Sequence, residues 1–140
     1  IDRLAKQYER VIVDTAGFKR KKNVDALARA DFVLIPCKPS PFDVREAVAA
    51  VELVREIADS KERRRRPLYH GIVLTMAQRT AISAQIREGL VNSGLPIMSA
   101  QIGQRVAFVE TPLTGFPPEG SVAALEIKLL AKEIMRRAKG

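Results

Sequence analysis

Four short apolar runs, separated by stretches with helical spacing, constrain the fold of this chain most strongly. The runs span residues 11–13, 32–35, 71–74 and 95–98. The first three lack alternating polar residues, as expected of strands covered on both faces of a parallel sheet. Strands that alternate with helices predict βαβ units. We therefore expect a three-layer α/β fold, a mostly parallel sheet with helices on both faces.

Helix start and stop signals support this layout. Residues 44–58 carry an apolar stripe, and Asp43 is expected at the N-cap with Glu46 three residues later. A second helix is predicted over 80–92, ended by Gly94. Shorter helices are predicted over 24–30 and 106–110. The length of 140 residues suits one domain, residues 1–140.

A last helix is predicted after residue 121. Ser121 is a suitable N-cap, and basic residues near the C-terminus of this helix suit the helix dipole. An apolar stripe is expected to pack against the sheet; it comprises Val122, Leu125, Leu129, Lys132 and Met135. Such packing explains the stripe better than a membrane-targeting helix does, so a membrane partner is not expected.

The charge balance points to an acidic partner. Lys and Arg number 24 against 16 Asp and Glu, a net charge of +8, which favours nucleic acid over anionic lipid. A single cysteine excludes a disulfide framework and favours a reducing cytoplasm. The chain begins at Ile1 rather than Met, so we expect it to be a portion of a longer protein.

The strongest local signal is an apolar run that ends in Asp14, Thr15, Ala16 and Gly17. A carboxylate at the carboxyl end of a central strand lies where open α/β sheets bind ligands, and it suits a Mg²⁺–nucleotide site. Gly17 permits a backbone approach to a terminal phosphate. A strand that simply ends in an Asp-containing turn is an equal alternative at this point.

Five segments together resemble the ParA/MinD family of deviant-Walker ATPases, and ParA-type partition proteins most closely. They are DTAG at 14–17, ALARADFVLIP at 26–36, PSPFDV at 39–44, RT at 79–80 and QRVAF at 104–108. The resemblance implies a P-loop NTPase-like fold and a homodimer that sandwiches ATP and binds double-stranded DNA without sequence preference. It also implies a ParB-like stimulating partner and a cytoplasmic, nucleoid-associated protein.

The resemblance also assigns residue roles. Asp14 becomes the Mg²⁺-binding catalytic carboxylate, and residues 15–17, including Thr15 and Gly17, become the phosphate-sensing switch. Pro39 and Asp43 would lie beside the ATP and the dimer contact. Arg105 falls where the family often places a DNA-contacting arginine.

Two departures from the family pattern matter. No glycine of this chain belongs to a phosphate-loop pattern, so these 140 residues alone are not expected to hydrolyse ATP, because little would neutralise the triphosphate. Thr75 and Met76 stand where many members of the family have an Asn-Arg pair. The Lys-x-Asp motif with which related GTPases recognise guanine is absent at this place, which favours adenine as the base near Thr75. The alternative function is a non-catalytic module that binds DNA or protein.

Two basic runs, residues 19–22 and 63–66, are predicted to be solvated loops. DNA phosphates are the favoured partner of the second run, which comprises Arg63, Arg64, Arg65 and Arg66. Two loops that only aid solubility are the alternative.

Overall fold

The computed structural model describes residues 1–15, 21–63, 66–78 and 80–139. Three parallel strands form its sheet in the order β1 (Phe32–Cys37), β2 (Tyr69–Ala77) and β3 (Ile97–Gly103). The register of β1 on β2 is regular, whereas β2 and β3 pair with shifts after Ile72 and after Leu74. The predicted parallel α/β sheet is therefore confirmed.

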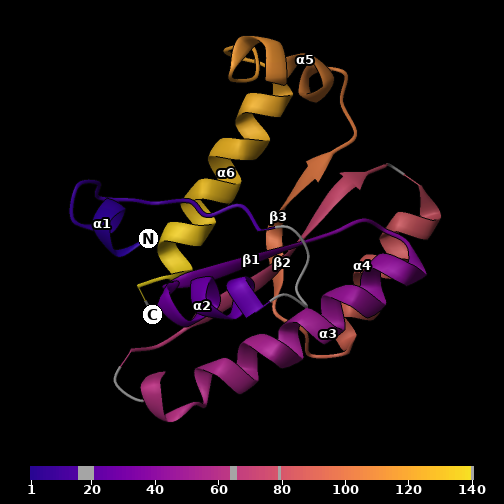
Figure 1. The fold of residues 1–140 in the computed structure, drawn as a ribbon. Coiled ribbons are helices and arrows are strands. Elements are labelled where there is room, and N and C mark those ends of the chain that lie inside the picture. The colour runs from indigo at the N-terminus through magenta and orange to yellow at the C-terminus, as the bar shows by residue number, and fades with distance from the viewer. Residues whose placement is uncertain (16–20, 64–65, 79, 140) are drawn as a thin grey trace.

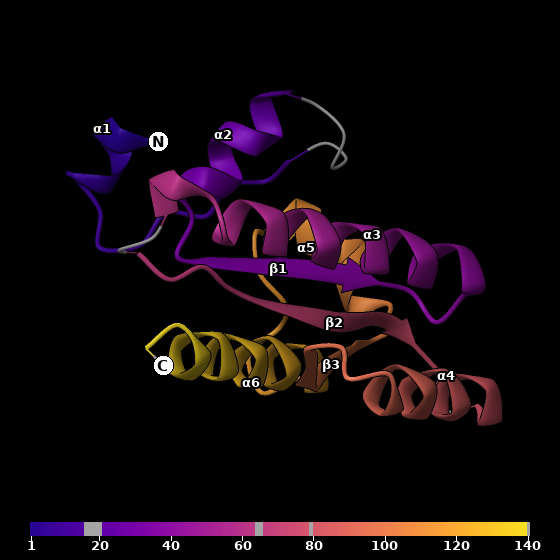
Figure 2. The same cartoon turned by 90° about the horizontal axis from the view of Figure 1, so that it is seen from below.

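Helices cover both faces of this sheet. In chain order the helices are α1 (Asp2–Ala5), α2 (Lys21–Arg29), α3 (Pro41–Ala58), the 3-10 turn η1 (Lys61–Arg63), α4 (Ala81–Asn92), α5 (Ala107–Thr114) and α6 (Val122–Arg137). Helices α3 and α4 lie on one side of the sheet and α6 on the other (Figure 1). Seen from below, α3 runs along β1 and α6 lies beside β3 (Figure 2). The three-layer expectation holds.

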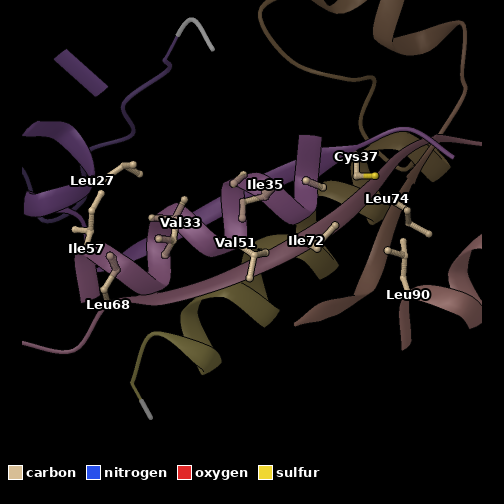
Figure 3. Packing of buried hydrophobic residues seen from close by; sticks show 13 residues of the cluster. Leu27, Val33, Ile35, Cys37, Val51, Ile57, Leu68, Ile72, Leu74 and Leu90 are labelled. Carbon is tan, nitrogen blue, oxygen red and sulfur yellow. The ribbon is translucent and has the colours of Figure 1, made fainter. Parts of the chain in front are cut away.

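The larger core lies between α3 and the first two strands. Val33 and Ile35 of β1 and Ile72 of β2 face Val51 and Val54 of α3, and all five side chains are buried (Figure 3). Alternate residues of β1 point to this face because side chains alternate along a strand. The apolar stripe predicted for residues 44–58 is thus the face of α3 that is buried against the sheet.

Helix α3 begins earlier than the sequence pattern suggests. Its N-cap is Ser40, whose hydroxyl Oγ accepts a hydrogen bond from the backbone N–H of Asp43 at 3.2 Å. Asp43 is therefore the third helical residue, and its carboxylate accepts a hydrogen bond from Ser40 Oγ. The expectation that Asp43 is the N-cap was wrong, since Pro41 fits the first helical position and shifts the cap to the residue before it.

Two other helices begin close to where the sequence predicts, and the N-cap expected at Ser121 is confirmed. Thr80 caps α4, and its Oγ1 accepts a hydrogen bond from the N–H of Ser83 at 3.2 Å. Ser121 caps α6, and its Oγ accepts a hydrogen bond from the N–H of Ala124 at 3.1 Å. Lys21 and Lys22, expected in a loop, begin α2.

Helix α6 contacts the sheet with a different face from the one predicted. Leu130 and Ala123 are buried there, and Leu130 packs against Val73 of β2 and Met98 of β3. The predicted stripe, which comprises Val122, Leu125, Leu129, Lys132 and Met135, is exposed. The burial of this other face has a physical cause: this face carries two carboxylates that accept hydrogen bonds from backbone N–H groups of β3.

Glu133 is the first of these carboxylates. Its Oε1 accepts a hydrogen bond from the N–H of Ser99 at 2.8 Å, and its Oε2 accepts one from the N–H of Ala100 at 2.7 Å. Arg137, one turn later, lies 2.8 Å from Glu133 Oε1 and donates to the carbonyl of Ile97 at 2.7 Å. Unpaired N–H groups of β3 are thereby satisfied by side chains of α6 rather than by another strand.

The first predicted strand is not formed. Residues 11–15 are irregular, and they pair with none of the three strands. Ile12 is 97% exposed, and Val13 is exposed as well. An apolar run becomes a strand only where a neighbouring strand takes up its N–H and C=O groups, and among the described residues none does so here. The fourth predicted strand, residues 95–98, overlaps β3 only in part, because β3 begins at Ile97 and continues to Gly103.

Candidate functional site

The carboxyl ends of the three parallel strands bring several predicted site residues to one edge of the sheet. Pro39 lies two residues after β1, Thr75 lies near the end of β2, and Arg105 lies two residues after β3. Parallel strands end at a common edge, and in open α/β sheets this edge is where ligands bind. The structure thus places Pro39, Thr75 and Arg105 at the edge that the sequence analysis assigned to a ligand.

A cleft of about 620 Å³ opens at this edge between the ends of β2 and β3. It is lined by Ala77, Gln78, Gly103, Gln104, Arg105, Val106 and Val109. The Gln78 amide Nε2 donates to Gln104 Oε1 at 2.5 Å, and the backbone N–H of Gln104 donates to the carbonyl of Ala77 at 3.2 Å. The cleft therefore offers amide and guanidinium groups beside two valines, a mixture that suits a small polar ligand.

Arg105 is held in place by Glu126 of α6. Its Nε lies 3.0 Å and its Nη2 2.6 Å from the carboxylate oxygens, and Glu126 Oε2 also accepts the N–H of Gly103 at 3.1 Å. The hydrogen bonds from Arg105 lower the pKa of Glu126, and the same interaction raises the pKa of Arg105. The pair is charged at every pH near neutrality, and Arg105 remains about one-third exposed.

The backbone is strained where β2 ends. Met76 has φ of 51°, in the left-handed region that a side chain other than Gly, Asn or Asp rarely adopts. The register between β2 and β3 shifts over the same stretch, between Leu74 and Ala77. Thr75 and Met76 thus leave the regular ladder just before Ala77, which lines the cleft. Backbone strain of this kind tends to occur at ligand sites.

Asp43 and Cys37 lie close together near the end of β1. Burial and, next, the nearby Asp43 carboxylate raise the pKa of Cys37 to about 11, and the thiol is fully buried. A thiol with so high a pKa stays protonated and is a poor nucleophile. Cys37 is therefore a packing residue of the core, and Asp43 lies in the first turn of α3, where its carboxylate accepts a hydrogen bond from Ser40.

The predicted metal site lies on a segment that the structure describes only as far as Thr15. Asp14 and Thr15 are exposed in the irregular segment, and Gly17 lies outside the described residues. No group of three or more His, Cys, Asp or Glu side chains that could hold a metal ion occurs in residues 1–15, 21–63, 66–78 and 80–139. The described strands also follow chain order without the reversal that creates the usual ligand crevice. The Mg²⁺–ATP site therefore stays a prediction, and no catalytic step is derived from the described residues.

The predicted basic run lies at the other edge of the sheet. Arg63 is only 3% exposed, and its guanidinium donates to the carbonyls of Ala28, Ala30 and Pro67, each at 2.9 Å. The prediction of a solvated arginine was wrong at this position, because Arg63 ties the end of α2 to the start of β2. Arg66 is exposed and pairs with Asp31 at 2.7 Å.

Two further observations concern this run. Arg64 and Arg65 lie outside the described residues. The nine residues of β2 separate Arg66 from the cleft edge by about 30 Å at 3.3 Å per residue. The structure therefore does not bring Arg66 and Arg105 together on one small surface.

The sequence reasoning missed Gln78, Gln104 and Glu126. Neither glutamine belongs to a charge or glycine pattern, and only the meeting of two strand ends makes them neighbours. Glu126 had one usable signal: it lies seven residues before Glu133, at a spacing that returns to the same helix face.

The comparisons with known proteins add one relative. The chain is 30% identical over 101 residues to a protein named ParA from Rhizobium radiobacter, which covers 70% of this chain and 44% of that protein. The chain thus spans less than half the length of this relative. No protein-family model matches the chain. The similarity supports a ParA-like relationship. Every helix within the described residues is too short or too polar to cross a membrane.

Proposed function

We propose that this chain belongs to a ParA-like partition switch whose active form is an ATP-bound homodimer that associates with duplex DNA. Two findings together support the proposal. One is the 30% identity to a ParA-named protein. The other is a parallel α/β sheet whose carboxyl edge carries Pro39, Thr75 and Arg105, with Arg105 lining a polar cleft. The proposed partner is a ParB-like protein, and the proposed location is the nucleoid in the cytoplasm.

The DNA-binding part of the proposal is supported by charge. The net charge is +8, and contacts to phosphates give affinity that is independent of sequence and falls with salt. Arg105 is the proposed contact at the cleft edge. Arg66 is the proposed contact at the opposite edge, and the buried Arg63 is left out. Arg64 and Arg65, which lie outside the described residues, stay proposed contacts on their charge alone.

The DNA proposal is tested by fluorescence anisotropy with two labelled duplexes of unrelated sequence, between ~50 and ~200 mM salt. We expect Arg105→Ala to weaken binding to both duplexes alike and to lower the salt slope by about one. Arg66→Ala tests in the same way whether the opposite edge of the sheet contributes to DNA affinity. Arg29→Ala, an exposed arginine paired with Asp2, serves as the charge-matched control. Loss of affinity for one sequence only, or no binding at low salt, contradicts the proposal.

The nucleotide part rests on Asp14, Thr15 and Gly17, with Pro39, Asp43 and Thr75 near the bound nucleotide. Because no glycine of these 140 residues belongs to a phosphate-loop pattern, we expect no heat of ATP–Mg²⁺ binding in calorimetry on the 140-residue chain. Micromolar affinity would mean that the phosphate site lies within these residues. Within a protein that carries a phosphate loop ahead of this chain, Asp14→Ala should abolish nucleotide-dependent dimerisation and turnover, because Mg²⁺ loses its ligand; unchanged ATPase kinetics would refute this role.

A second candidate is a non-catalytic module that binds DNA or protein. The exposed, irregular segment around Asp14 and the lack of a metal-binding cluster in the described residues favour it. The two candidates separate in one comparison: DNA affinity that changes when ATP and Mg²⁺ are added to the phosphate-loop-containing protein supports the switch, and unchanged affinity supports the module.

A further inference from the structure

Helix α6 turns its acidic residues inward and leaves an outer face without any carboxylate. Glu126 and Glu133, the only acidic residues of the helix, accept hydrogen bonds from N–H groups of β3 and pair with Arg105 and Arg137. The exposed cations of the helix and its end are Lys128, Lys132, Arg136 and Lys139. None of these four forms an ion pair with another described residue. The outer face therefore carries positive charge that its own helix does not balance.

Aliphatic side chains lie between these cations. Val122 and Leu125 are each 54% exposed and Leu129 is 50% exposed, although α6 packs on the sheet with its other side. Their positions, separated by three and then four residues, form the narrow seam by which one helix packs against another. Lys132 and Arg136 continue the same seam toward the C-terminus of the helix. In Figure 1 this helix is the outer layer on its side of the sheet.

We propose that this outer face of α6 binds an amphipathic helix of a partner protein, with aliphatic residues along one seam and acidic residues beside it. Such a helix would cover Val122, Leu125 and Leu129 and pair its carboxylates with Lys128, Lys132 and Arg136. The proposal stands independently of the proposed function, because it uses neither the cleft nor Arg105.

Charge and composition select this occupant over three others. A second copy of α6 would place its own unpaired cations against Lys128, Lys132 and Arg136, and the like charges would repel each other. Duplex DNA offers phosphates to the cations but no apolar surface that would cover three aliphatic side chains. A bilayer surface is favoured by aromatic residues at its interface, and α6 has none. An acidic amphipathic helix satisfies both the charge and the seam.

The test uses the 140-residue chain and a synthetic helical peptide as the probe. The peptide carries Leu at the seam positions and Glu at the flanking positions, and a matched peptide carries Lys in place of each Glu. We expect saturable binding of the acidic peptide in titration calorimetry and none of the basic peptide. Reversing the charges with Lys128→Glu and Lys132→Glu should weaken binding by about tenfold or more, and Leu125→Gln with Leu129→Gln should abolish it.

The control reverses the same amount of charge on the other side of the sheet. Arg45→Glu with Arg55→Glu on the exposed face of α3 should leave the affinity unchanged, and circular dichroism verifies that each variant is folded. No binding of the acidic peptide, equal binding of the basic one, or equal loss in the α3 control overturns the proposal. Binding to vesicles of phosphatidylglycerol and phosphatidylcholine with no binding of the peptide, or displacement of the peptide by duplex DNA, overturns it as well.

Discussion

Helices α3 and α6 cover opposite faces of the same sheet, yet they do so with different chemistry. Helix α3 buries a row of small and branched apolar residues, comprising Ala47, Ala50, Val51, Val54 and Ile57. Helix α6 buries Ala123 and Leu130 together with Glu133, while its most apolar stripe faces outward. A hydrophobic stripe therefore identifies the buried face of a helix only where no backbone group of the sheet requires a side-chain partner.

The difference follows from where each helix lies. Helix α3 packs on the face of β1 and β2, which pair with each other in regular register, and no side chain of α3 has a described hydrogen bond to the backbone of either strand. Helix α6 packs beside β3, whose N–H groups at Ser99, Ala100 and Gly103 are not bonded to a further strand in the described chain. A buried unpaired N–H costs about 1–3 kcal/mol, and this cost favours glutamate over leucine at the contact.

The largest expected effect is a charge placed on the buried face of α3. Val51→Asp puts a carboxylate at a fully buried position, and it should destabilise the chain by more than about 4 kcal/mol because no partner for the charge is at hand. Urea denaturation followed by circular dichroism measures this. A variant with an unchanged unfolding midpoint would mean that α3 does not cover the core.

The next effect concerns the carboxylate on the buried face of α6. Glu133→Ala leaves the N–H groups of Ser99 and Ala100 without an acceptor and Arg137 without its ion pair, so we expect a loss of about 3–5 kcal/mol. Glu133→Leu, which fills the space with an apolar side chain, is the informative companion. If Glu133→Leu were as stable as the original chain, burial alone would explain the contact and the comparison of the two helices would fail.

Acid should weaken the α6 side selectively. Burial raises the pKa of Glu133, but the N–H groups of Ala100 and Ser99 and the Arg137 charge outweigh it, so the pKa lies below its ordinary value; the hydrogen bonds from Arg105 lower the pKa of Glu126. Because both pKa values are lower in the folded than in the unfolded state, the stabilisation is present above about pH 4.3 and is lost as the pH falls through the folded-state values.

Unfolding midpoints measured from neutral pH down to acid check this expectation. A double variant, Glu126→Gln with Glu133→Gln, should flatten the pH profile in the acid range while a single Glu52→Gln on the exposed face of α3 leaves it as it was. The same acid slope in the double variant and in the original chain would assign the acid sensitivity to other groups.

The smallest expected effect is on the exposed stripe of α6. Leu125→Gln should change the stability by no more than about 0.5 kcal/mol, because more than half of the side chain is already in water. Thermal unfolding is sufficient to measure it. A loss comparable to that of a core residue would show that the stripe is buried in solution, and it would restore the face that the sequence pattern predicted.

Much of the architecture could be predicted from the sequence. The apolar runs at 32–35 and 71–74 became β1 and β2, the helix predicted over 80–92 agrees with α4 to within one residue, and the cap at Ser121 was correct. These features depend on neighbouring residues alone. Pro39, Thr75 and Arg105 were chosen from the resemblance alone, and they lie at one edge because parallel strands share their carboxyl ends.

Other features required the tertiary structure. The run at 11–13 has the composition of a strand but no neighbouring strand in the described chain, so composition alone could not decide its state. Arg63 looked like one of four equivalent arginines until the carbonyls of Ala28, Ala30 and Pro67 were brought around it.

The sequence by itself determined where the longer helices and two of the described strands lie, because local spacing and capping act within a few residues. Only the tertiary structure decided which face of α6 is buried, which arginine is structural and which side chains line the cleft. These outcomes depend on backbone N–H and C=O groups far away in the sequence, whose need for partners no local pattern records.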